Sequence, residues 1–318
     1  MTDQLLVSNS EIQTWKDCRR KWWLSYYREL GVRREDDQPV GARQLGTRIH
    51  IALCAMYEEQ TNPVDVVNAV YAEDIALFAS DPDKVIDLKK EQDLAKAMLE
   101  GYIEWVATEA ADDGIELVAA ETVIEVPSGN PRVTLRGKLD QRVVRKTDGA
   151  RLFLDHKTVA DLTTPVRLLP IDEQMKFYHL LEKLDAVHKT GSKQQWRTDG
   201  GLYNMLRKVK RTATAKPPFY GRAEVRHNEE VIRNMWTRVH KILVELVDAR
   251  DALDSGADHQ YVCPPRPSKD CTWKCDFFSI CPMFDDGSNV EGLIDEYFTH
   301  LDPHERYNAE DQGKEVGK

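Results

Sequence analysis

Two strand-like stretches joined by a turn constrain the fold of this chain more than any other feature. Apolar or small residues alternate with polar ones over residues 133–140, and residues 151–157 form a second stretch that looks like a strand. This alternation is typical of β-strands that bury one face. Residues 147–149 read Thr-Asp-Gly, which is a turn signal. We therefore predict that the second strand folds back against the first and brings Asp155 close to Asp140.

The polar residues of these two strands suggest a metal site. The period of two places Asp155 and Lys157 on one face of their strand, with His156 on the other. Two carboxylates supply hard oxygen ligands for a divalent cation such as Mg²⁺, and a nearby lysine can hold water or stabilise charge on a phosphate. The alternative is a solvated strand edge, because Asp-x-Lys is a common triplet.

The six cysteines supply a second constraint. Cys271, Cys275 and Cys281 are clustered, and Cys18 lies near the other end of the chain. Four thiolates can hold either an iron-sulfur cluster or a structural zinc ion, and the absence of paired Cys-x2-Cys motifs favours a 4Fe-4S cluster. Disulfides are the alternative. We expect a reducing cytoplasm, however, because no signal peptide precedes Met1 and no apolar run reaches transmembrane length.

Two other cysteines stand outside this group. Cys54 lies in an apolar helical pattern and is expected to act as a small buried hydrophobic residue. Cys263, directly before Pro264 and Pro265, is either a spectator or a substitute ligand for the cluster.

Two helical segments add candidate site residues. His50 lies in a segment with helical spacing and is either a metal ligand or an ordinary helix residue. Gln174 and Tyr178 are four residues apart and share a helix face, where an amide and a phenol can hydrogen-bond a phosphate or the lysine. The alternative for this second segment is an ordinary amphipathic helix with Phe177 in the core.

The charge of the chain does not by itself indicate a nucleic-acid binder. The net charge is −10, but local patches dominate contacts with phosphates. One basic stretch contains Arg207, Lys208, Lys210, Arg211, Lys216 and Arg222. It is either a loop over a DNA channel or a solvated loop. A second stretch interleaves Arg19, Arg20 and Lys21 with Trp15, Trp22, Trp23, Tyr26 and Tyr27. These aromatic rings either stack bases or belong to the core.

The pattern along the chain predicts an α/β protein. Ser10-x-x-Gln13 matches a capping box and predicts a helix to about residue 27. Further on, the periodicity predicts helices over much of 45–110 with a break at 81–83, strands over 117–158, a helix over 171–185, a strand over 200–206 and a helix over 228–254.

We predict a single domain over residues 1–302, since 318 residues with 41% hydrophobic content can bury a large core. Its parts are a mainly helical region with His50 and the first cluster cysteine, a core sheet, a helix with the cysteine cluster, and then a disordered tail, over residues 1–110, 111–225, 226–302 and 303–318.

The order of these motifs resembles the PD-(D/E)XK nucleases of the RecB-like group. Within that group it is similar to the iron-sulfur exonuclease branch, which contains the fourth CRISPR-associated family and many phage proteins. The resemblance spans about residues 8–284 and rests on short motifs in a fixed order, namely Trp15-x2-Cys18, His50, Gly137-x2-Asp140, Asp155-x-Lys157, Gln174-x3-Tyr178 and the three clustered cysteines.

The resemblance implies a fold and a role for each residue. It implies a restriction-endonuclease-like core, a mixed sheet flanked by helices, with the cluster joining the N- and C-terminal segments. His50, Asp140, Asp155 and the main-chain carbonyl of His156 would bind Mg²⁺ or Mn²⁺. Lys157 would align the attacking water, and Gln174 and Tyr178 would complete the site. Glu121 matches an acidic position in a preceding strand, and Cys18, Cys271, Cys275 and Cys281 would bind the 4Fe-4S cluster, zinc being the alternative.

The function implied is that of a metal-dependent DNA exonuclease acting on single-stranded ends. Two alternatives remain open. One is a subunit that selects DNA ends for a CRISPR-adaptation or phage recombination complex, and the other is a zinc-bearing DNA-binding module without activity. No phosphate-binding Gly-x4-Gly-Lys-Ser/Thr loop occurs in the sequence, so any helicase would be a separate chain. No membrane partner is expected.

Overall fold

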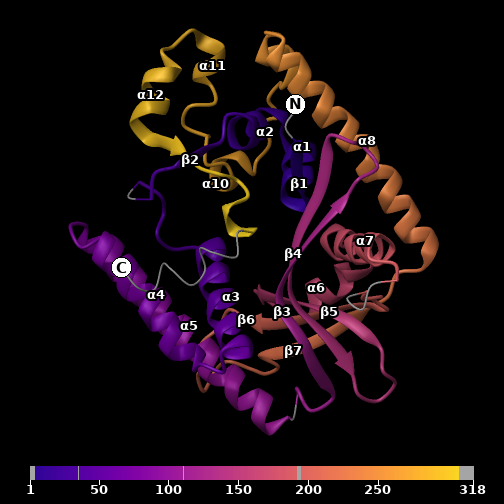
Figure 1. The fold of residues 1–318 in the computed structure, drawn as a ribbon. Coiled ribbons are helices and arrows are strands. Elements are labelled where there is room, and N and C mark those ends of the chain that lie inside the picture. Colours follow the sequence, from indigo (N-terminus) through magenta and orange to yellow (C-terminus); the bar gives the residue numbers. More distant parts are fainter. Residues whose placement is uncertain (1–3, 35, 110, 192–194, 308–318) are drawn as a thin grey trace. The chain divides into compact units, whose positions relative to one another are not determined.

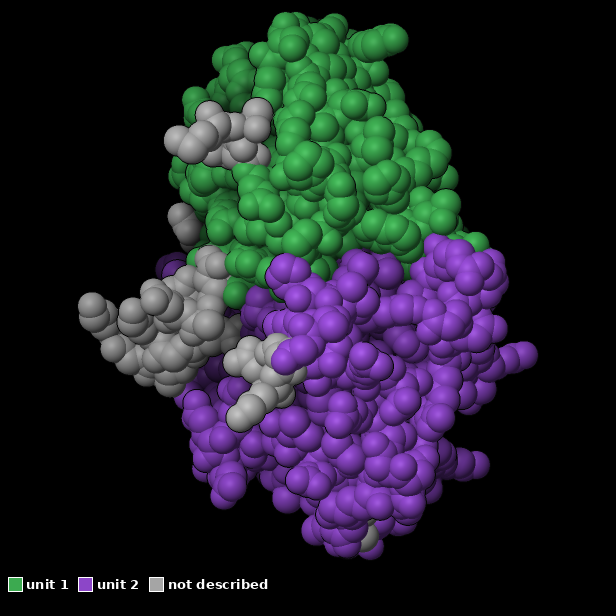
Figure 2. Space-filling view, turned by 45° about the vertical axis from the view of Figure 1, so that its right-hand side comes forward, with its two compact units in different colours: residues 1–37, 125–136, 234–318 green, residues 38–124, 137–233 purple. Residues whose placement is uncertain are grey.

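The computed structural model describes residues 4–34, 36–109, 111–191 and 195–307 (Figure 1). The chain divides into two compact units, which are coloured separately in Figure 2. Unit 1 is drawn from residues 1–37, 125–136 and 234–318, and unit 2 from residues 38–124 and 137–233. The single domain over residues 1–302 stays a prediction.

Unit 1 is mainly helical. Its elements are β1 (Leu5–Ser8), α1 (Asn9–Asp17), α2 (Arg19–Trp22), a π-helical turn (Trp23–Tyr27), β2 (Leu30–Val32), α8 (Glu229–Asp254, from residue 234 on), α9 (His259–Val262), α10 (Cys271–Lys274), α11 (Met283–Asp286), α12 (Val290–Tyr297), β8 (Phe298–His300) and a 3-10 turn (Glu305–Tyr307). Strand β1 pairs in parallel with the start of β4, and β2 pairs antiparallel with β8.

The first helix begins two residues earlier than its predicted cap. The side chain of Ser8 accepts a hydrogen bond from the main-chain N–H of Glu11, so the capping motif is Ser8-x-x-Glu11. The assignment to Ser10 and Gln13 was wrong because Ser8 ends β1 with extended backbone, as an N-cap requires, whereas Ser10 lies inside the helix. The predicted helix to residue 27 is also interrupted at Cys18, whose backbone is extended.

Unit 2 contains the rest of the described secondary structure. Its elements are α3 (Ala42–Glu58), α4 (Pro63–Leu77), α5 (Pro82–Thr108), β3 (Ile115–Pro127), β4 (Val133–Arg145), β5 (Arg151–Val159), α6 (Thr163–Leu168), a 3-10 turn (Leu169–Ile171), α7 (Glu173–His188), β6 (Gly200–Arg207) and β7 (Tyr220–Val225). The parts of β3 before residue 125 and of β4 after residue 136 belong to this unit.

The sheet of unit 2 is mixed and has helices on both faces. Strand β4 pairs with β3 and runs antiparallel to β5, which is parallel to β6, and β6 is antiparallel to β7. Helix α7 covers one face, where the ring of Tyr178 meets that of Phe153. Helices α3 and α5 reach the other face, where Tyr57 and Tyr102 surround His156 and Asn204. The predicted α/β fold with a flanked mixed sheet is therefore confirmed, while the iron-sulfur part of that prediction stays a prediction.

A buried ion-pair network ties the three helices α3, α4 and α5 together. Arg48 on α3 lies 2.5 Å from the Asp74 carboxylate on α4 and 2.6 Å from Glu91 on α5. Tyr71 donates its hydroxyl to the same Glu91 carboxylate, so the buried guanidinium and the buried acids satisfy one another. The network fixes helix α3, which carries His50 two residues after Arg48.

Two regional findings complete the fold. The predicted tail over residues 303–318 is described only to residue 307, where Tyr307 is buried, and residues 308–318 lie outside the described part. Within the described ranges, none of the helices combines the length and the apolar character that crossing a membrane requires.

Candidate functional site

The antiparallel pairing of β4 and β5 brings the two predicted carboxylates together. The strands pair through Gln141 and Leu154, and Asp140 and Asp155 stand one residue beyond that pair. The main-chain N–H of His156 donates a 2.6 Å hydrogen bond to Asp140 Oδ2. The same oxygen lies 3.4 Å from Nδ1 of His50 on α3.

Lys157 is held from two sides. Its ammonium lies 2.8 Å from Asp155 Oδ2 and donates a 2.8 Å hydrogen bond to Gln174 Oε1. The amide nitrogen of Gln174 donates in turn to the hydroxyl oxygen of Tyr178, at 2.9 Å. The amide of Gln174 thus contacts the lysine, and the phenol of Tyr178 contacts that amide.

Gly137 explains how helix α7 comes close enough to make these contacts. A Cβ atom at this position would lie 2.4 Å from Leu181 Cδ1 and 3.6 Å from a ring carbon of Tyr178. Leu181 is fully buried and has little room to move away. The glycine of the Gly-x-x-Asp motif therefore leaves space for the helix that carries Gln174 and Tyr178.

The pKa values of the two carboxylates are shifted in opposite directions. Burial favours the neutral form of Asp140, but the charge and hydrogen bond of His50, with the N–H of His156, outweigh it and lower the pKa of Asp140. Burial raises the pKa of Asp155 to about 6, with a further increase from the neighbouring Asp140 charge that the Lys157 ammonium opposes. The pair therefore holds one firmly ionised carboxylate and one that takes up a proton easily.

The two acids raise the pKa of both basic side chains of the site. Burial would lower the pKa of His50, yet Asp140 raises it above its ordinary value. Burial would likewise lower the pKa of Lys157, and the charge and hydrogen bond of Asp155 raise it instead. In this arrangement each carboxylate has its own basic partner.

His156 lies on the face of β5 opposite to Asp155 and Lys157, as the strand period predicts, and its ring meets that of His50 at 6.1 Å between centroids. Its ring is 97% buried, stacks on Tyr57 at 5.7 Å between ring centroids, and contacts the side chains of Gln141 and Asn204. Burial lowers the pKa of His156 to about 3, so the ring is neutral. The proposed ligand is its main-chain carbonyl, and that role stays a prediction.

The donor set of the site suits a hard divalent cation. In residues 4–34, 36–109, 111–191 and 195–307, no three His, Cys, Asp or Glu side chains are already arranged as a metal site. Asp140, Asp155 and His50 nevertheless supply two adjacent carboxylates and an imidazole, which is the ligand chemistry that Mg²⁺ and Mn²⁺ accept. Their present partners, His50 for Asp140 and Lys157 for Asp155, occupy the carboxylate oxygens.

Comparison with known proteins decides the family. The model of the PD-(D/E)XK nuclease superfamily matches residues 6–282. The chain belongs to the PD-(D/E)XK nuclease superfamily. A search of curated proteins gave no match. Among solved structures, one titled "Crystal structure of SSO0001" matches 68% of this chain and 81% of its own, at 15% identity and a TM-score of 0.30.

Membership of the PD-(D/E)XK superfamily supports a nuclease and hydrolase with a DNA substrate. Nucleases of this superfamily generally use divalent metals such as Mg²⁺ or Mn²⁺, in agreement with the carboxylate pair described above. The roles assigned to individual site residues, and the RecB-like, CRISPR-associated and phage branches, remain predictions.

Glu121 lies beside the site in a strained conformation. Its φ of 45° is in the left-handed region although it stands within β3, and its carboxylate forms an ion pair with Lys138. Burial raises the pKa of Glu121, Lys138 opposes the rise, and Asp140 and Glu58 add to it. These electrostatic interactions place the carboxylate close to the site, but its role in a superfamily site stays a prediction.

The four predicted cluster cysteines all belong to unit 1 and are free thiols. Burial raises the pKa of Cys275 and of Cys281, and Cys18 raises both further, so these three sulfurs lie within electrostatic reach. Arg20 Nη1 lies 3.7 Å from the sulfur of Cys281, and Ser268 donates its N–H to that of Cys271 at 3.3 Å. The sulfurs of Cys281 and Cys271 have hydrogen-bond donors nearby, as metal-bound thiolates do, but among the described residues no three of these cysteines are gathered as a metal site, and the cluster stays a prediction.

The two cysteines outside the predicted cluster are Cys263 and Cys54. Cys263 is fully buried, and burial raises its pKa to about 12, with Cys18 contributing. Cys54 is only half-buried and donates to Glu58 at 3.3 Å, so its assignment as a buried apolar residue was wrong. The thiol sits one turn after His50 on α3, on a face that carries polar side chains.

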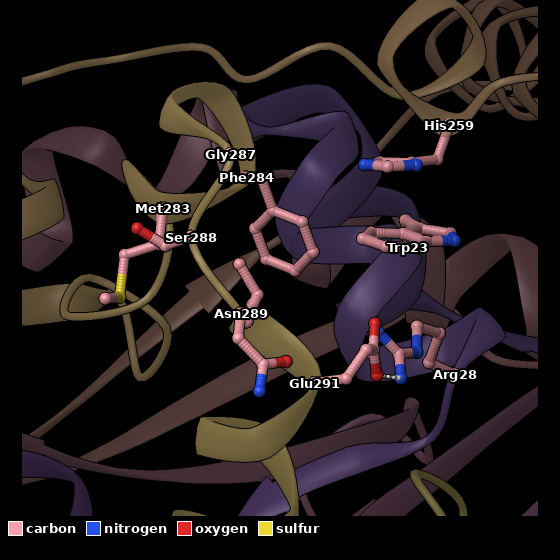
Figure 3. Close-up of a pocket in the computed structure, with 10 residues that line it drawn as sticks. Trp23, Arg28, His259, Met283, Phe284, Gly287, Ser288, Asn289 and Glu291 are labelled. Carbon is pink, nitrogen blue, oxygen red and sulfur yellow. Dashed lines mark hydrogen bonds and ion pairs between the residues drawn. The ribbon is translucent and has the colours of Figure 1, made fainter.

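Four of the aromatic residues near the N-terminus belong to the core, which was the alternative to stacking on bases. Trp15, Trp22, Trp23 and Tyr26 are at most 9% exposed. Figure 3 shows Trp23 in a pocket of about 380 Å³, where His259 stacks on it at 4.2 Å between centroids. Arg28 lies 5.3 Å from the same ring. These four rings are therefore core residues, whereas Tyr27 is half-buried.

The basic stretch 207–222 is paired with acids. Arg211 lies 2.7 Å from Glu104 on α5, and Lys210 lies 3.6 Å from Asp93. Arg222 belongs to strand β7 and forms an ion pair with Asp112. Arg222 therefore belongs to a strand and not to a loop. Lys210 and Arg211 remain partly exposed in their surface ion pairs, so for them the hypothesis of a basic loop over a DNA channel stays a prediction.

Proposed function

We propose that this chain is a metal-dependent DNA exonuclease of the RecB-like, iron-sulfur branch that acts on single-stranded ends. The observation that carries the nuclease proposal is the contact chain from Asp155 through Lys157 and Gln174 to Tyr178, beside Asp140 and His50. The sequence order of the motifs supports the branch and the exonuclease mode.

The chain's own residues divide the work of hydrolysis. A divalent ion held by Asp140, Asp155 and His50 would neutralise phosphate charge and make hydroxide available near neutral pH. Lys157 can donate to a water or to a phosphate oxygen, since an ammonium carries three donors. Gln174 uses its oxygen to orient Lys157, and its amide nitrogen bonds to Tyr178, so the lysine is aimed before substrate binds.

The nuclease proposal is tested with end-labelled single- and double-stranded DNA in Mg²⁺, Mn²⁺ or chelator. Asp155→Ala and Lys157→Ala are expected to abolish degradation, and chelator should abolish it in the native protein. Asp161→Ala and Lys183→Ala remove a carboxylate and an ammonium outside the site and should retain full activity. Circular dichroism establishes that each variant is folded. Unchanged cleavage by both site variants would refute the proposal.

We also propose that Cys18, Cys271, Cys275 and Cys281 hold a structural 4Fe-4S cluster. The electrostatic proximity of three of these thiols within unit 1 supports it. Protein purified without oxygen is expected to contain iron and labile sulfide in equal amounts and to absorb visible light. Zinc without iron or sulfide would show that the group is a zinc site instead.

A further inference from the structure

A polar network in unit 2 connects His156 on β5 to Asn204 on β6 and to Arg222 on β7. Asn204 on β6 donates its amide N–H to Nδ1 of His156 at 2.8 Å, and Asn204 is fully buried. The amide oxygen of Asn204 accepts a 3.0 Å hydrogen bond from Nε of Arg222 on β7. The second amide hydrogen of Asn204 goes to the hydroxyl of Tyr102, at 2.9 Å.

Arg222 determines the direction of every hydrogen bond in this network. A guanidinium can only donate, so Asn204 must turn its oxygen toward Arg222 and its NH₂ group toward His156. Nδ1 of His156 is then an acceptor, and the proton of the neutral ring resides on Nε2. The amide nitrogen of Gln141 lies 3.2 Å from Nε2 of His156, so the Gln141 amide, whose O and N are interchangeable by a flip, must be turned to present its oxygen to that N–H.

The alternative orientation is excluded by the surrounding groups. If the Asn204 amide were reversed, its NH₂ group would face the Arg222 donor inside the protein, where opposed donors are costly. Arg222 is itself fixed by an ion pair with Asp112 and lies 5.5 Å from the ring of Trp105. The orientation of the Asn204 amide is therefore set by Arg222, which can only donate hydrogen bonds.

We propose that Arg222 and Asn204 are positioning residues that lock His156 as its Nε2–H tautomer and thereby hold the main-chain N–H of His156 on Asp140. The link is His156 itself, because its ring is anchored by Asn204 on one face of β5 while its N–H donates to Asp140 Oδ2. The functional part of this inference rests on the proposed nuclease activity, since Asp140 matters only if it serves the reaction.

The decisive variant is Asn204→Asp. A carboxylate still accepts from Arg222, but it cannot donate to His156, so an oxygen lone pair would face the Nδ1 lone pair. We expect the ring proton to move from Nε2 to Nδ1, with the ring remaining neutral. Nitrogen-15 NMR of the imidazole distinguishes the two tautomers, and it requires no nuclease activity. The native protein should show an unprotonated Nδ1 and a protonated Nε2.

The matched control is Asn68→Asp. Asn68 on α4 accepts from Gln92 at 2.9 Å and has the same chemical change without contact to His156. It should leave the His156 spectrum and the DNA cleavage rate at their native values. For Asn204→Asp, removal of support from behind a ligand predicts a loss of about 10- to 100-fold in kcat. The KM for DNA should stay within about twofold, because no substrate contact is removed.

The outcomes separate the inference from the proposed function. A native His156 with its proton on Nδ1 would overturn the lock, whatever the activity. A tautomer change with native kcat would overturn the positioning role. If Asn204→Asp does not fold, Arg222→Gln tests the same point. Glutamine can donate or accept, so both tautomers of His156 should be populated in this variant. A single Nε2–H tautomer in Arg222→Gln would refute the lock. Absence of cleavage by the native protein would refute only the nuclease proposal.

Discussion

Gln174 and Lys157 form the residue contact whose loss should be easiest to measure. Gln174→Leu removes the acceptor that orients the lysine, and a hydrogen bond to a charged group contributes about 1.5–3 kcal/mol. If that energy serves the reaction, the single-turnover rate on labelled DNA should fall by about 10- to 100-fold. Gln44→Leu, at a glutamine outside the site that donates to the main chain of Gln38, should leave the rate unchanged. Equal rates in both variants would contradict the assignment.

Glu11 predicts a pH dependence of stability in unit 1. Burial raises its pKa from 4.5 to about 7, although Arg250 and the 2.9 Å hydrogen bond from Trp22 lower it. The folded state therefore binds a proton that the unfolded state has released, and the free energy of unfolding falls as pH rises from 4.5 to about 7.

Glu11→Gln removes this titration. The difference in the free energy of unfolding between native protein and variant should change between about pH 5 and about pH 7.5, with the native protein losing more stability at the higher pH. Urea unfolding at the two pH values measures it. The exposed Glu116→Gln serves as control and should follow the native profile. A constant difference between Glu11→Gln and the native protein would show that Glu11 does not titrate in this window.

At the scale of elements, the contact of β6 with α7 depends on a residue without a side chain. A Cβ atom on Gly201 would lie 2.5 Å from the Phe153 ring and 2.5 Å from Met175 of α7. Gly201→Ala should therefore overpack this layer and lower the free energy of unfolding by about 1–3 kcal/mol. Gly114→Ala meets no atom within 4 Å and should be nearly neutral. Thermal unfolding compares them, and similar midpoints would contradict the packing argument.

The elements near the site could be predicted because their signals are local. The alternation along β4, the strand-like residues of β5 and the turn between them indicated that Asp155 comes close to Asp140, and the four-residue spacing placed Gln174 and Tyr178 together. The break at Cys18 could not be predicted, because helical periodicity continues across it and only the backbone torsions change. Ser8-x-x-Glu11 matches the same capping pattern as Ser10-x-x-Gln13, and only the backbone conformation distinguishes them.

Contacts between distant segments were missed for a different reason. Arg222 looked like one cation of a basic loop, and nothing in its neighbours indicates Asn204 or Asp112 as partners. The one available signal was Asn204 itself, a polar residue inside an otherwise apolar strand that is buried over seven positions. Such a residue needs hydrogen-bond partners, but the sequence does not say which segment supplies them.

For the whole molecule, the proposed cluster predicts a large effect of one N-terminal thiol. A cluster bound by Cys18 and by residues 271–281 closes most of the chain into a loop, and such closure restricts the unfolded state. Cys18→Ser should lose iron and lower the thermal midpoint. Cys54→Ser in unit 2 should keep both. Native iron content in Cys18→Ser would exclude it as a ligand, and Cys263→Ser would then test the neighbouring thiol.

The division of the chain into interleaved units has a consequence for biosynthesis. The ribosome releases His50 through Tyr178, and the remaining strands of unit 2 to residue 233, before the third segment of unit 1 exists. Domains tend to fold as units during synthesis. Unit 2, which carries the proposed catalytic residues, can therefore assemble while Cys271, Cys275 and Cys281 are still untranslated, so the proposed cluster would form only after unit 2 has been synthesised.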